Sequence, residues 1–396
     1  MKKILFVLSL SVFFFSTVLY ACSDGSGPAI LPEEEKEEKE EPVKEAPSAK
    51  GITDMALIYH TGKDRPKWTS GELSPYLFRE NKETKAIEWL FDGFLFLEIR
   101  GERDGKAYDY ALPSNYELEE WKLTTARKQE WDQLVTATFA DKCGPNALEI
   151  ALDSMAQKGH VPKSKRQVVI AIPNPFWGQQ DWGSIEGVKE GKPLVFYSAN
   201  EQLAAVKWYV DRVEEIWKSK KYKHIELTGF YWLNESLIKG YGDHALIRAV
   251  QPEIEQRGYD FIWIPYNGAG SVEQWKDFKF TTAYQQPNYF FDNVVDIEKM
   301  ERALKTAEKY NMALEMEFDD RILSDKATFL ARYYTYIDEF EKANVWKDKP
   351  VAYYQGTAAW LKMSRSLDPD IKVAYNKLAD ILVARQGKFT TIIKDK

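Results

Sequence analysis

The chain has 396 residues, of which 44% are hydrophobic and 29% are charged, and this balance excludes collagen-like, wholly disordered and multi-span membrane proteins. Its formal net charge of −7 argues against a nucleic-acid polymer as ligand, because phosphate backbones are bound through clustered Lys and Arg. Aromatic residues make up 14% of the chain, and their flat faces suit either a packed core or the stacking of sugar rings.

An export signal is predicted at the N-terminus, over residues 1–21. Two lysines precede a mostly apolar run over 4–15, which is too short for a comfortable membrane-spanning helix. The Ala21-Cys22 junction resembles the bacterial lipobox, and this resemblance implies that Cys22 is lipidated and becomes the first mature residue. The alternative is a simple cleaved signal followed by an incidental cysteine.

Residues 22–50 are predicted to form a disordered, Glu-rich tether. They carry one Asp, eight Glu and four Lys, with most of the charge in 33–41, and they offer no apolar face to bury. Lipidation of Cys22 leaves Cys143 alone, so no disulfide is expected and the core must hold the fold. Such a tether resembles those of Bacteroidetes surface lipoproteins that process glycans. It implies an outer-membrane lipoprotein of the cell envelope, either periplasmic or surface-exposed.

The body of the chain, residues 51–396, is predicted to be a single domain of alternating strands and helices. Eight apolar or aromatic runs have the length of buried strands, at 54–60, 93–100, 167–174, 225–233, 259–266, 280–286, 312–318 and 350–355. Helical periodicity is found at 116–140, 201–219, 243–256, 296–310, 325–343 and 368–385. Eight such units favour a closed α/β barrel, the (β/α)8 or TIM barrel, over an open doubly wound sheet.

Functional residues of such barrels lie where the strands end. The predicted strands end in side chains that form hydrogen bonds, so these ends are candidate parts of a substrate site. The candidates for substrate binding are His60, Glu98, Asn174, Tyr266, Gln285 and Tyr354. Candidate stacking platforms for sugar rings are Trp177, Trp182 and Trp232, whereas Trp208 and Trp217 have the helical spacing of core residues.

Two strand ends carry carboxyl groups that are expected to meet across the barrel mouth. The fourth strand runs into Asn234 and Glu235, and the seventh places Glu315 and Glu317 on one face of an otherwise apolar strand. Glycoside hydrolysis uses such a pair, since one acid protonates the leaving oxygen while the other carboxylate attacks the anomeric carbon.

This arrangement resembles the clan A glycoside hydrolases, which are (β/α)8 retaining enzymes. The resemblance implies that Glu235 is the acid/base and Glu317 the nucleophile. It also implies that Asn234 contacts the sugar 2-hydroxyl and that Tyr284 lies against the nucleophile. More narrowly, the chain resembles Bacteroidetes lipoprotein families described as domains of unknown function, which adds no chemistry. A retaining pair implies carboxyl groups about 5–5.5 Å apart, against roughly 6.5–9.5 Å for an inverting pair.

These assignments have structural alternatives. Asn234 is also suited to cap a following helix. Either Glu315 or Glu317 could form a buried ion pair with Arg100 or Arg321, and Glu317 is preferred as nucleophile because it lies nearer the mouth.

No metal or cofactor is expected, because the four histidines are scattered and the chain has no zinc, nucleophile-elbow, P-loop or dinucleotide motif. The sequence therefore predicts a lipid-anchored, monomeric glycoside hydrolase that cleaves a poly- or oligosaccharide by a retaining mechanism and has no nucleic-acid partner. The alternative is a non-catalytic glycan-binding surface lipoprotein on the same scaffold.

Overall fold

The computed structural model describes residues 45–62, 65–111, 124–291 and 296–393. The predicted signal peptide, Cys22 and most of the predicted tether lie outside the described residues. Ordered structure begins before residue 51, because Ala46 is buried and Ala49–Lys50 form the short strand β1. Among the described residues, no helix combines the length and apolar character that crossing a membrane requires.

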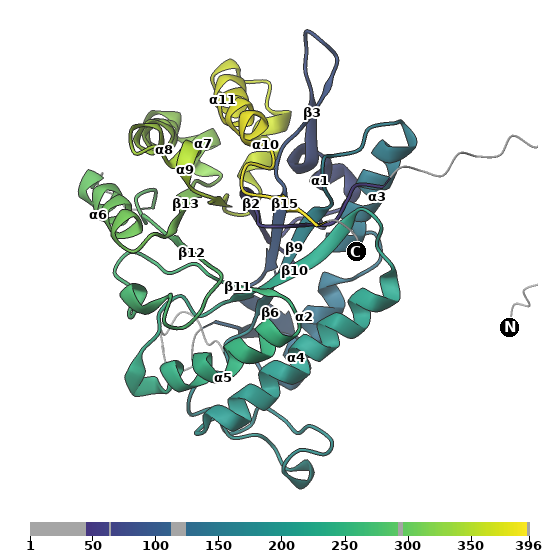
Figure 1. Cartoon of the computed structure of the whole chain (residues 1–396), viewed down its shortest axis with the longest axis vertical. Helices are drawn as coiled ribbons and strands as arrows, with labels where there is room; N and C mark the ends of the chain where they lie inside the picture. Colours follow the sequence, from purple (N-terminus) through teal and green to yellow (C-terminus); the bar gives the residue numbers. More distant parts are fainter. Residues whose placement is uncertain (1–44, 63–64, 112–123, 292–295, 394–396) are drawn as a thin grey trace, which may run out of the picture. The chain divides into compact units, whose positions relative to one another are not determined.

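Eight parallel strands form a closed barrel (Figure 1). In chain order they are β2 (Asp54–Tyr59), β5 (Gly93–Leu97), β9 (Arg166–Ile172), β10 (Ile225–Trp232), β11 (Asp260–Trp263), β12 (Thr282–Gln285), β13 (Ala313–Glu317) and β14 (Val351–Tyr354). Each pairs with the next along the chain, and β14 pairs with β2 to close the ring. Each predicted apolar run overlaps one of these strands, so the predicted (β/α)8 barrel is confirmed.

Helices connect the strands and cover the outside of the barrel (Figure 1). The longer ones are α1 (Ser70–Leu77), α2 (Lys128–Thr138), α3 (Gly144–Gln157), α4 (Ala199–Lys220), α5 (Asp243–Gln256), α6 (Ile297–Lys309), α8 (Ala331–Lys342) and α11 (Pro369–Arg385). Between β11 and β12 the chain forms only the 3₁₀ turn η3 (Val272–Gln274), so this unit lacks an α-helix.

Short elements fill the loops. They are the hairpin β3 (Phe78–Glu80) and β4 (Ile87–Trp89), the small sheet β6 (Arg100–Arg103), β7 (Lys106–Asp109) and β8 (Thr124–Thr125), the helices α7 (Arg321–Ser324), α9 (Val345–Asp348) and α10 (Ala359–Arg365), the 3₁₀ turns η1 (Lys189–Gly191) and η2 (Lys239–Tyr241), and the π-helical turn η4 (Lys326–Leu330). Two predicted bounds differ as a result. The second barrel strand ends at Leu97 rather than at residue 100, and the described helix within 116–140 begins at Lys128.

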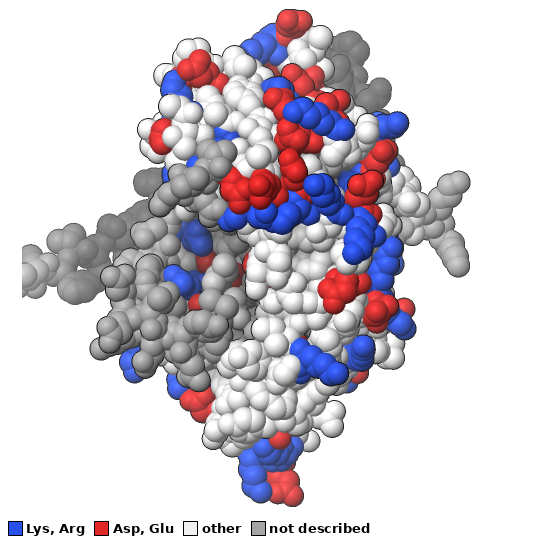
Figure 2. Space-filling view, turned by 90° about the vertical axis from the view of Figure 1, so that its left-hand side faces the viewer, with Lys and Arg blue, Asp and Glu red and all other residues white. Residues whose placement is uncertain are grey.

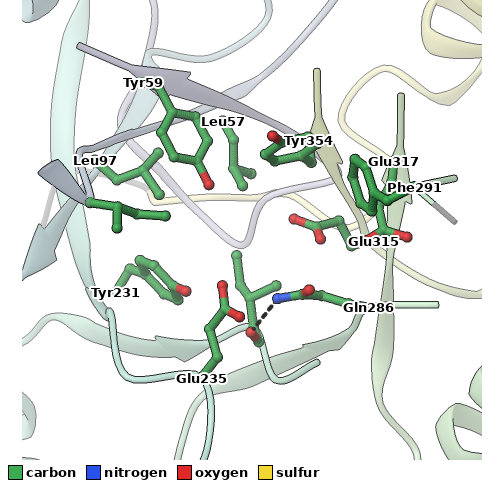
Figure 3. Close-up of a pocket in the computed structure, with 12 residues that line it drawn as sticks. Leu57, Tyr59, Leu97, Tyr231, Glu235, Gln286, Phe291, Glu315, Glu317 and Tyr354 are labelled. Atoms are coloured by element: carbon green, nitrogen blue, oxygen red, sulfur yellow. Dashed lines mark hydrogen bonds between the residues drawn. The ribbon is translucent and has the colours of Figure 1, made fainter. Parts of the chain in front are cut away.

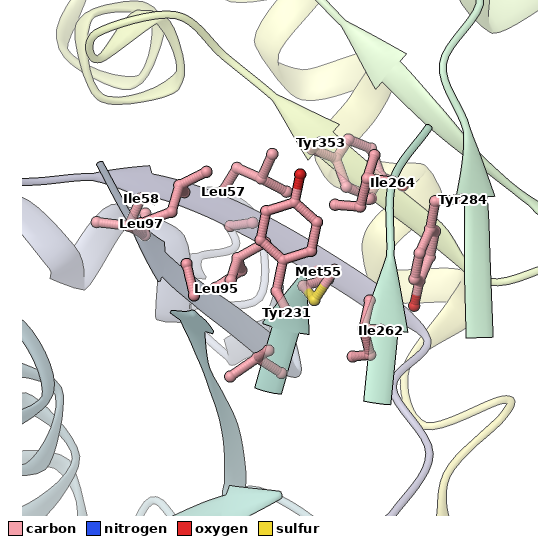
Figure 4. Close-up of a cluster of buried hydrophobic side chains, with 14 of the residues drawn as sticks. Met55, Leu57, Ile58, Leu95, Leu97, Tyr231, Ile262, Ile264, Tyr284 and Tyr353 are labelled. Carbon is pink, nitrogen blue, oxygen red and sulfur yellow. The ribbon is translucent and has the colours of Figure 1, made fainter. Parts of the chain in front are cut away.

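The interior of the barrel is a packed core. Side chains alternate along each strand, so residues two apart on β2 point inward together. Figure 4 shows this layer, which includes Met55, Leu57, Leu95, Leu97, Tyr231, Ile262 and Ile264, all buried. The barrel strands are buried over nearly their whole length because helices cover their outer face. The upper residues of this layer, such as Leu57 and Leu97, also line the cavity in which the candidate functional residues lie.

The amino-terminal end of the barrel is closed by both ends of the described chain. Strand β1 pairs antiparallel with β15 (Thr391–Ile392). Beside this pair, the Arg385 guanidinium donates to the Asp54 carboxylate at 3.0 Å, and both side chains are almost fully buried. The Tyr353 hydroxyl donates to the same carboxylate at 2.7 Å. The last long helix is thereby fastened to the first barrel strand.

The surface carries both signs of charge. On the face seen in Figure 2, acidic and basic side chains are interspersed and large areas are uncharged. This face therefore has no extended area of a single sign that would steer a highly charged polymer.

Candidate active site

A cavity of about 260 Å³ lies at the carboxyl ends of the barrel strands (Figure 3). Its lining residues come from seven of the eight strands or the loops that follow them, and they are Leu57, Tyr59, Leu97, Ile99, Tyr231, Glu235, Ile264, Gln286, Phe291, Glu315, Glu317 and Tyr354. The lining residues Leu57, Leu97 and Ile264 belong to the apolar core of the barrel, whereas most of those nearer the opening are polar or aromatic. This is the end of a (β/α)8 barrel at which catalytic residues are found.

Three carboxyl groups meet in this cavity. Glu235 enters from the loop after β10, and Glu315 and Glu317 enter from β13, where their spacing of two places them on the same inward face. Figure 3 shows the carboxyl groups of Glu235 and Glu315 directed toward the centre of the cavity. The structure thus brings together the two predicted catalytic residues and the alternative nucleophile.

Hydrogen-bond donors surround the Glu317 carboxyl group. The Tyr336 hydroxyl, from α8, donates to one oxygen, and the Asn288 side-chain amide donates to the other at 3.3 Å. The backbone N–H groups of Asn288 and Tyr289 also hydrogen-bond to this carboxyl, and these donors favour its ionised form. Burial and the charge of Glu235 act in the opposite direction, and the net result is a pKa of Glu317 raised to about 7.

The loop after β12 supplies the Glu317 donors because of its backbone shape. Asn288 has a φ of +53°, in the left-handed region that Asn tolerates better than most residues. Its side-chain oxygen accepts from the Asn267 N–H at 2.7 Å, which fixes the side chain against the neighbouring loop. Its amide nitrogen donates to the Gln286 side chain at 3.0 Å as well as to Glu317. The loop after β12 therefore contacts Glu317 directly and Glu235 through Gln286.

Glu235 has fewer partners. Burial raises the pKa of its carboxyl group to about 7, and a hydrogen bond from Gln286 offsets this only in part. The Gln286 amide is itself fixed, because its nitrogen donates to the Ile264 carbonyl at 2.9 Å, the dashed line in Figure 3. Glu235 is thus suited to hold a proton near neutral pH, whereas the donors around Glu317 favour a negative charge there.

Glu315 lies deeper and is 3% exposed. Its pKa is raised well above the usual value by burial and by the neighbouring carboxylates of Glu317 and Glu235. The ion pairs considered from the sequence do not form, because Arg321 pairs with Asp319 at 2.7 Å and Arg100 lies 3.6 Å from Asp109.

Aromatic rings form much of the remaining wall. Tyr354 packs edge-on against Tyr59, with ring centroids 5.6 Å apart, and against Phe291 at 5.4 Å. Tyr231 points its hydroxyl into the cavity beside Glu235 (Figure 3). Of these four, only Tyr354 was a candidate from the sequence.

Several predicted substrate-binding residues are held in internal contacts. The Glu98 carboxylate accepts from Arg65 at 2.9 and 3.1 Å, and His60 contacts the Thr138 hydroxyl at 3.3 Å. The Asn174 amide donates to the Ala111 carbonyl at 2.9 Å. The Gln285 amide donates to the Pro265 carbonyl at 3.3 Å. The backbone carbonyl of Asn234 accepts from the Trp263 indole at 2.9 Å, and the Asn234 side chain contacts Ser236 and Asp243. None of these predicted residues lines the cavity.

Tyr284 does not contact Glu317, and the expectation that it would is corrected. In the β12–β13 pairing Tyr284 is level with Ala313, four residues before Glu317. It lines a separate hollow near Lys50 and Asp260, toward the amino-terminal end of the barrel. The tyrosine against Glu317 is Tyr336, which lies on a helix and so could not be found from strand ends.

Two of the three candidate tryptophan platforms are core residues. Trp182 packs among Trp131, Phe196 and Trp208, and Trp232 is fully buried against Phe261. They are therefore not accessible to a sugar ring, and the expectation for them is corrected.

Trp177 is partly exposed, so its role as a stacking platform stays a prediction. It forms an edge-on pair with Tyr197, with centroids 6.0 Å apart, and both line a hollow of about 420 Å³ between the loop after β9 and the segment 124–127. Tyr266, after β11, is 39% exposed and does not line the central cavity.

Among the described residues, no group of three or more His, Cys, Asp or Glu is arranged to hold a metal ion.

The model of one protein family matches residues 54–380, and its description is "Domain of unknown function (DUF4855)". No curated protein matches the sequence at a significant level.

Solved structures with a similar fold include the GH18 chitinase ChiB from the chitin utilization locus of Flavobacterium johnsoniae (9% identity, covering 85% of this chain and 96% of that one, TM-score 0.38). Others are TsXylA, the intracellular xylanase from Thermoanaerobacterium saccharolyticum (12%, 76% and 91%, TM-score 0.35), and a glycerophosphodiester phosphodiesterase from Parabacteroides distasonis (12%, 83% and 99%, TM-score 0.31). At these values the likeness concerns the barrel and says nothing about activity.

Proposed function

The chain belongs to the DUF4855 family, and from the site that this domain carries we propose that it is a glycoside hydrolase that cleaves a poly- or oligosaccharide with retention of configuration. The observation that carries the proposal is the meeting of Glu235 and Glu317 in one cavity at the mouth of the barrel, in unlike surroundings. Two carboxyl groups that differ in this way are suited to the two roles of glycoside hydrolysis.

The proposed roles follow from the contacts. Tyr336 and Asn288 hold Glu317 ready as the ionised nucleophile, while Glu235, with one amide partner, keeps the proton. The charge of Glu235 adds to the burial that raises the pKa of Glu317, and the donors around Glu317 favour the ionised form of that residue.

The proposed reaction has two steps. Glu317 attacks the anomeric carbon while the Glu235 proton passes to the leaving oxygen, which breaks the glycosidic bond and forms a glycosyl ester on Glu317. A water then attacks the anomeric carbon, Glu235 takes its proton, and the Glu317 carboxylate leaves. The aromatic wall around Tyr354 offers faces on which a sugar ring stacks during both steps.

A panel of poly- and oligosaccharides tests this function. The purified protein is expected to release reducing ends from at least one glycan, and proton NMR of the first product is expected to show the anomer of the substrate. Glycan binding without turnover would favour a non-catalytic binding protein, and an inverted first product would contradict Glu317 as nucleophile.

The Glu235→Ala variant is expected to separate substrates by their leaving group. With a natural glycan, kcat/KM falls by roughly 10²–10⁴-fold, whereas an activated aryl glycoside, which needs no proton, keeps it within about tenfold. Because the pKa of Glu235 is raised to about 7, wild-type kcat/KM on the glycan declines as the pH rises through that value and the acid loses its proton. The variant lacks this alkaline decline on the aryl glycoside. Equal losses on both substrates, measured by steady-state kinetics, would contradict the acid role.

A further inference from the structure

The cavity has an excess of acidic groups that the proposed hydrolysis does not use. Three carboxyl groups face it, and its lining residues include no Lys, Arg or His. The Arg65 guanidinium lies 4.8 Å from the centre of the Tyr59 ring, but it forms two hydrogen bonds with Glu98 and does not line the cavity. Hydrolysis needs two carboxyl groups, so Glu315 remains without a role.

Glu315 also lacks the partners that buried carboxylates have elsewhere in this protein. Among the described residues no hydrogen bond or ion pair to its carboxyl group is formed, although only 3% of the residue is exposed. By contrast, Glu98 and Asp54 are each paired with an arginine. Burying an unpaired carboxyl group is costly, and in this position the group points into the cavity (Figure 3). A bound molecule is therefore the natural partner.

Aromatic groups around Glu315 also favour a positive charge. Tyr59, Tyr231, Tyr354 and Phe291 present rings to the same space, and the electron-rich faces of aromatic rings attract cations. The hydroxyl groups of Tyr59 and Tyr231 form no hydrogen bond within the described residues, and these two side chains are more than nine-tenths buried. They are free to contact the same ligand.

We propose that the sugar bound in this cavity carries a free ammonium group, as glucosamine- and galactosamine-type residues do, and that Glu315 is the specificity-determining residue that pairs with it, releasing to solvent the proton that it holds in the empty cavity. The inference rests on the proposed hydrolase function and names its substrate class. The cavity of about 260 Å³ is small for a ligand pocket, so it suits one sugar ring. Hydroxyl groups of a neutral sugar, or the uncharged amide of an N-acetylated one, would offer Glu315 no cation with which to form an ion pair.

The test compares matched sugars on the wild-type protein. Binding of glucosamine and galactosamine is measured by calorimetry at about pH 6, where the amine is protonated, beside their N-acetylated forms and glucose and galactose. Turnover is measured with oligosaccharides of the same linkages in the amine, N-acetyl and hydroxyl forms. We expect the amine form to bind roughly 10- to 100-fold more tightly than its neutral analogues and to be the form that is cleaved.

The Glu315→Gln variant keeps the shape of the side chain and removes its ability to ionise beside a bound ammonium group. It is expected to lower affinity for the amine sugars by roughly 10- to 100-fold and to leave the weak binding of neutral sugars unchanged. Glu226→Gln is the matched control, because Glu226 lies at the amino-terminal end of β10, away from the cavity. It is expected to leave the affinities for both amine and neutral sugars unchanged.

The possible results separate the inference from the function on which it rests. Cleavage of a neutral or N-acetylated glycan in preference to its amine form would overturn the inference and leave the hydrolase proposal standing. Failure to bind or cleave any sugar would overturn both. The preference of the wild-type protein decides the question even if the Glu315→Gln chain does not fold.

Discussion

The Glu317→Gln variant is expected to lose turnover by roughly 10³-fold or more while its thermal stability stays close to that of the wild type. The amide has the same shape as the carboxyl group: its oxygen can accept from the Asn288 side-chain amide, and its nitrogen can donate to the Tyr336 hydroxyl oxygen. What it lacks is the charge that attacks the anomeric carbon. Initial rates on a substrate that the wild type cleaves, together with a melting curve, measure both effects.

Chemical rescue distinguishes a nucleophile from a residue that only supports the site. With Glu317→Ala and an activated substrate, added azide is expected to attack from the side that the carboxylate occupied and to give a glycosyl azide of inverted configuration. With Glu235→Ala, azide replaces water in the second step and gives the retained glycosyl azide. If azide rescues neither variant while both remain folded, Glu235 and Glu317 are not the catalytic pair.

The Arg385→Met variant is expected to destabilise the fold by about 3–5 kcal/mol, because it leaves the buried Asp54 carboxylate without its counter-charge. It also removes a hydrogen bond of 2.9 Å to the Lys349 carbonyl. Burial already raises the pKa of Asp54 to about 7, against the influence of Arg385. Without Arg385 the pKa of Asp54 rises further, so the variant cannot ionise this group as cheaply as the wild type does. Its deficit is therefore smallest near pH 5, where both proteins hold the proton, and grows as the pH rises through about 7 to pH 8.

Denaturant titrations at both pH values measure this effect. Arg302→Met is the matched control, because Arg302 forms its ion pairs with Asp296 and Glu298 on the exposed side of α6, and its loss is expected to cost less than about 1 kcal/mol. A second substitution, Asp54→Asn, is expected to recover part of the loss in the Arg385→Met background. Equal effects of Arg385→Met and Arg302→Met would show that the buried pair adds no stability.

The barrel could be predicted from the sequence because burial on both faces makes its strands nearly continuous apolar runs, such as 167–174. The loop structure could not. The stretch after β5 forms a small sheet through β6 and β7, since strand ends and hairpins have similar short-range patterns. Nor could the sequence show that η3 replaces a helix between β11 and β12, because that depends on how the loop packs.

The carboxyl groups of the site could be predicted for the same reason, since an ionisable residue such as Glu317 is conspicuous in an apolar strand. Their partners could not. Tyr336 lies 19 residues beyond Glu317 and reaches it only because α8 packs back on β13. Similarly, Trp182 differs from Trp177 in burial and not in any local pattern. Contacts between distant segments depend on packing, which spacing along one strand does not reveal.

The pairing of β1 with β15 also places the start of the described chain at one end of the barrel. The described chain enters beside Ala49 at the amino-terminal end of the barrel, whereas Glu235 and Glu317 stand at the other end. If Cys22 carries a lipid, as we propose from the sequence, the predicted tether is connected to the domain at the end of the barrel opposite the cavity.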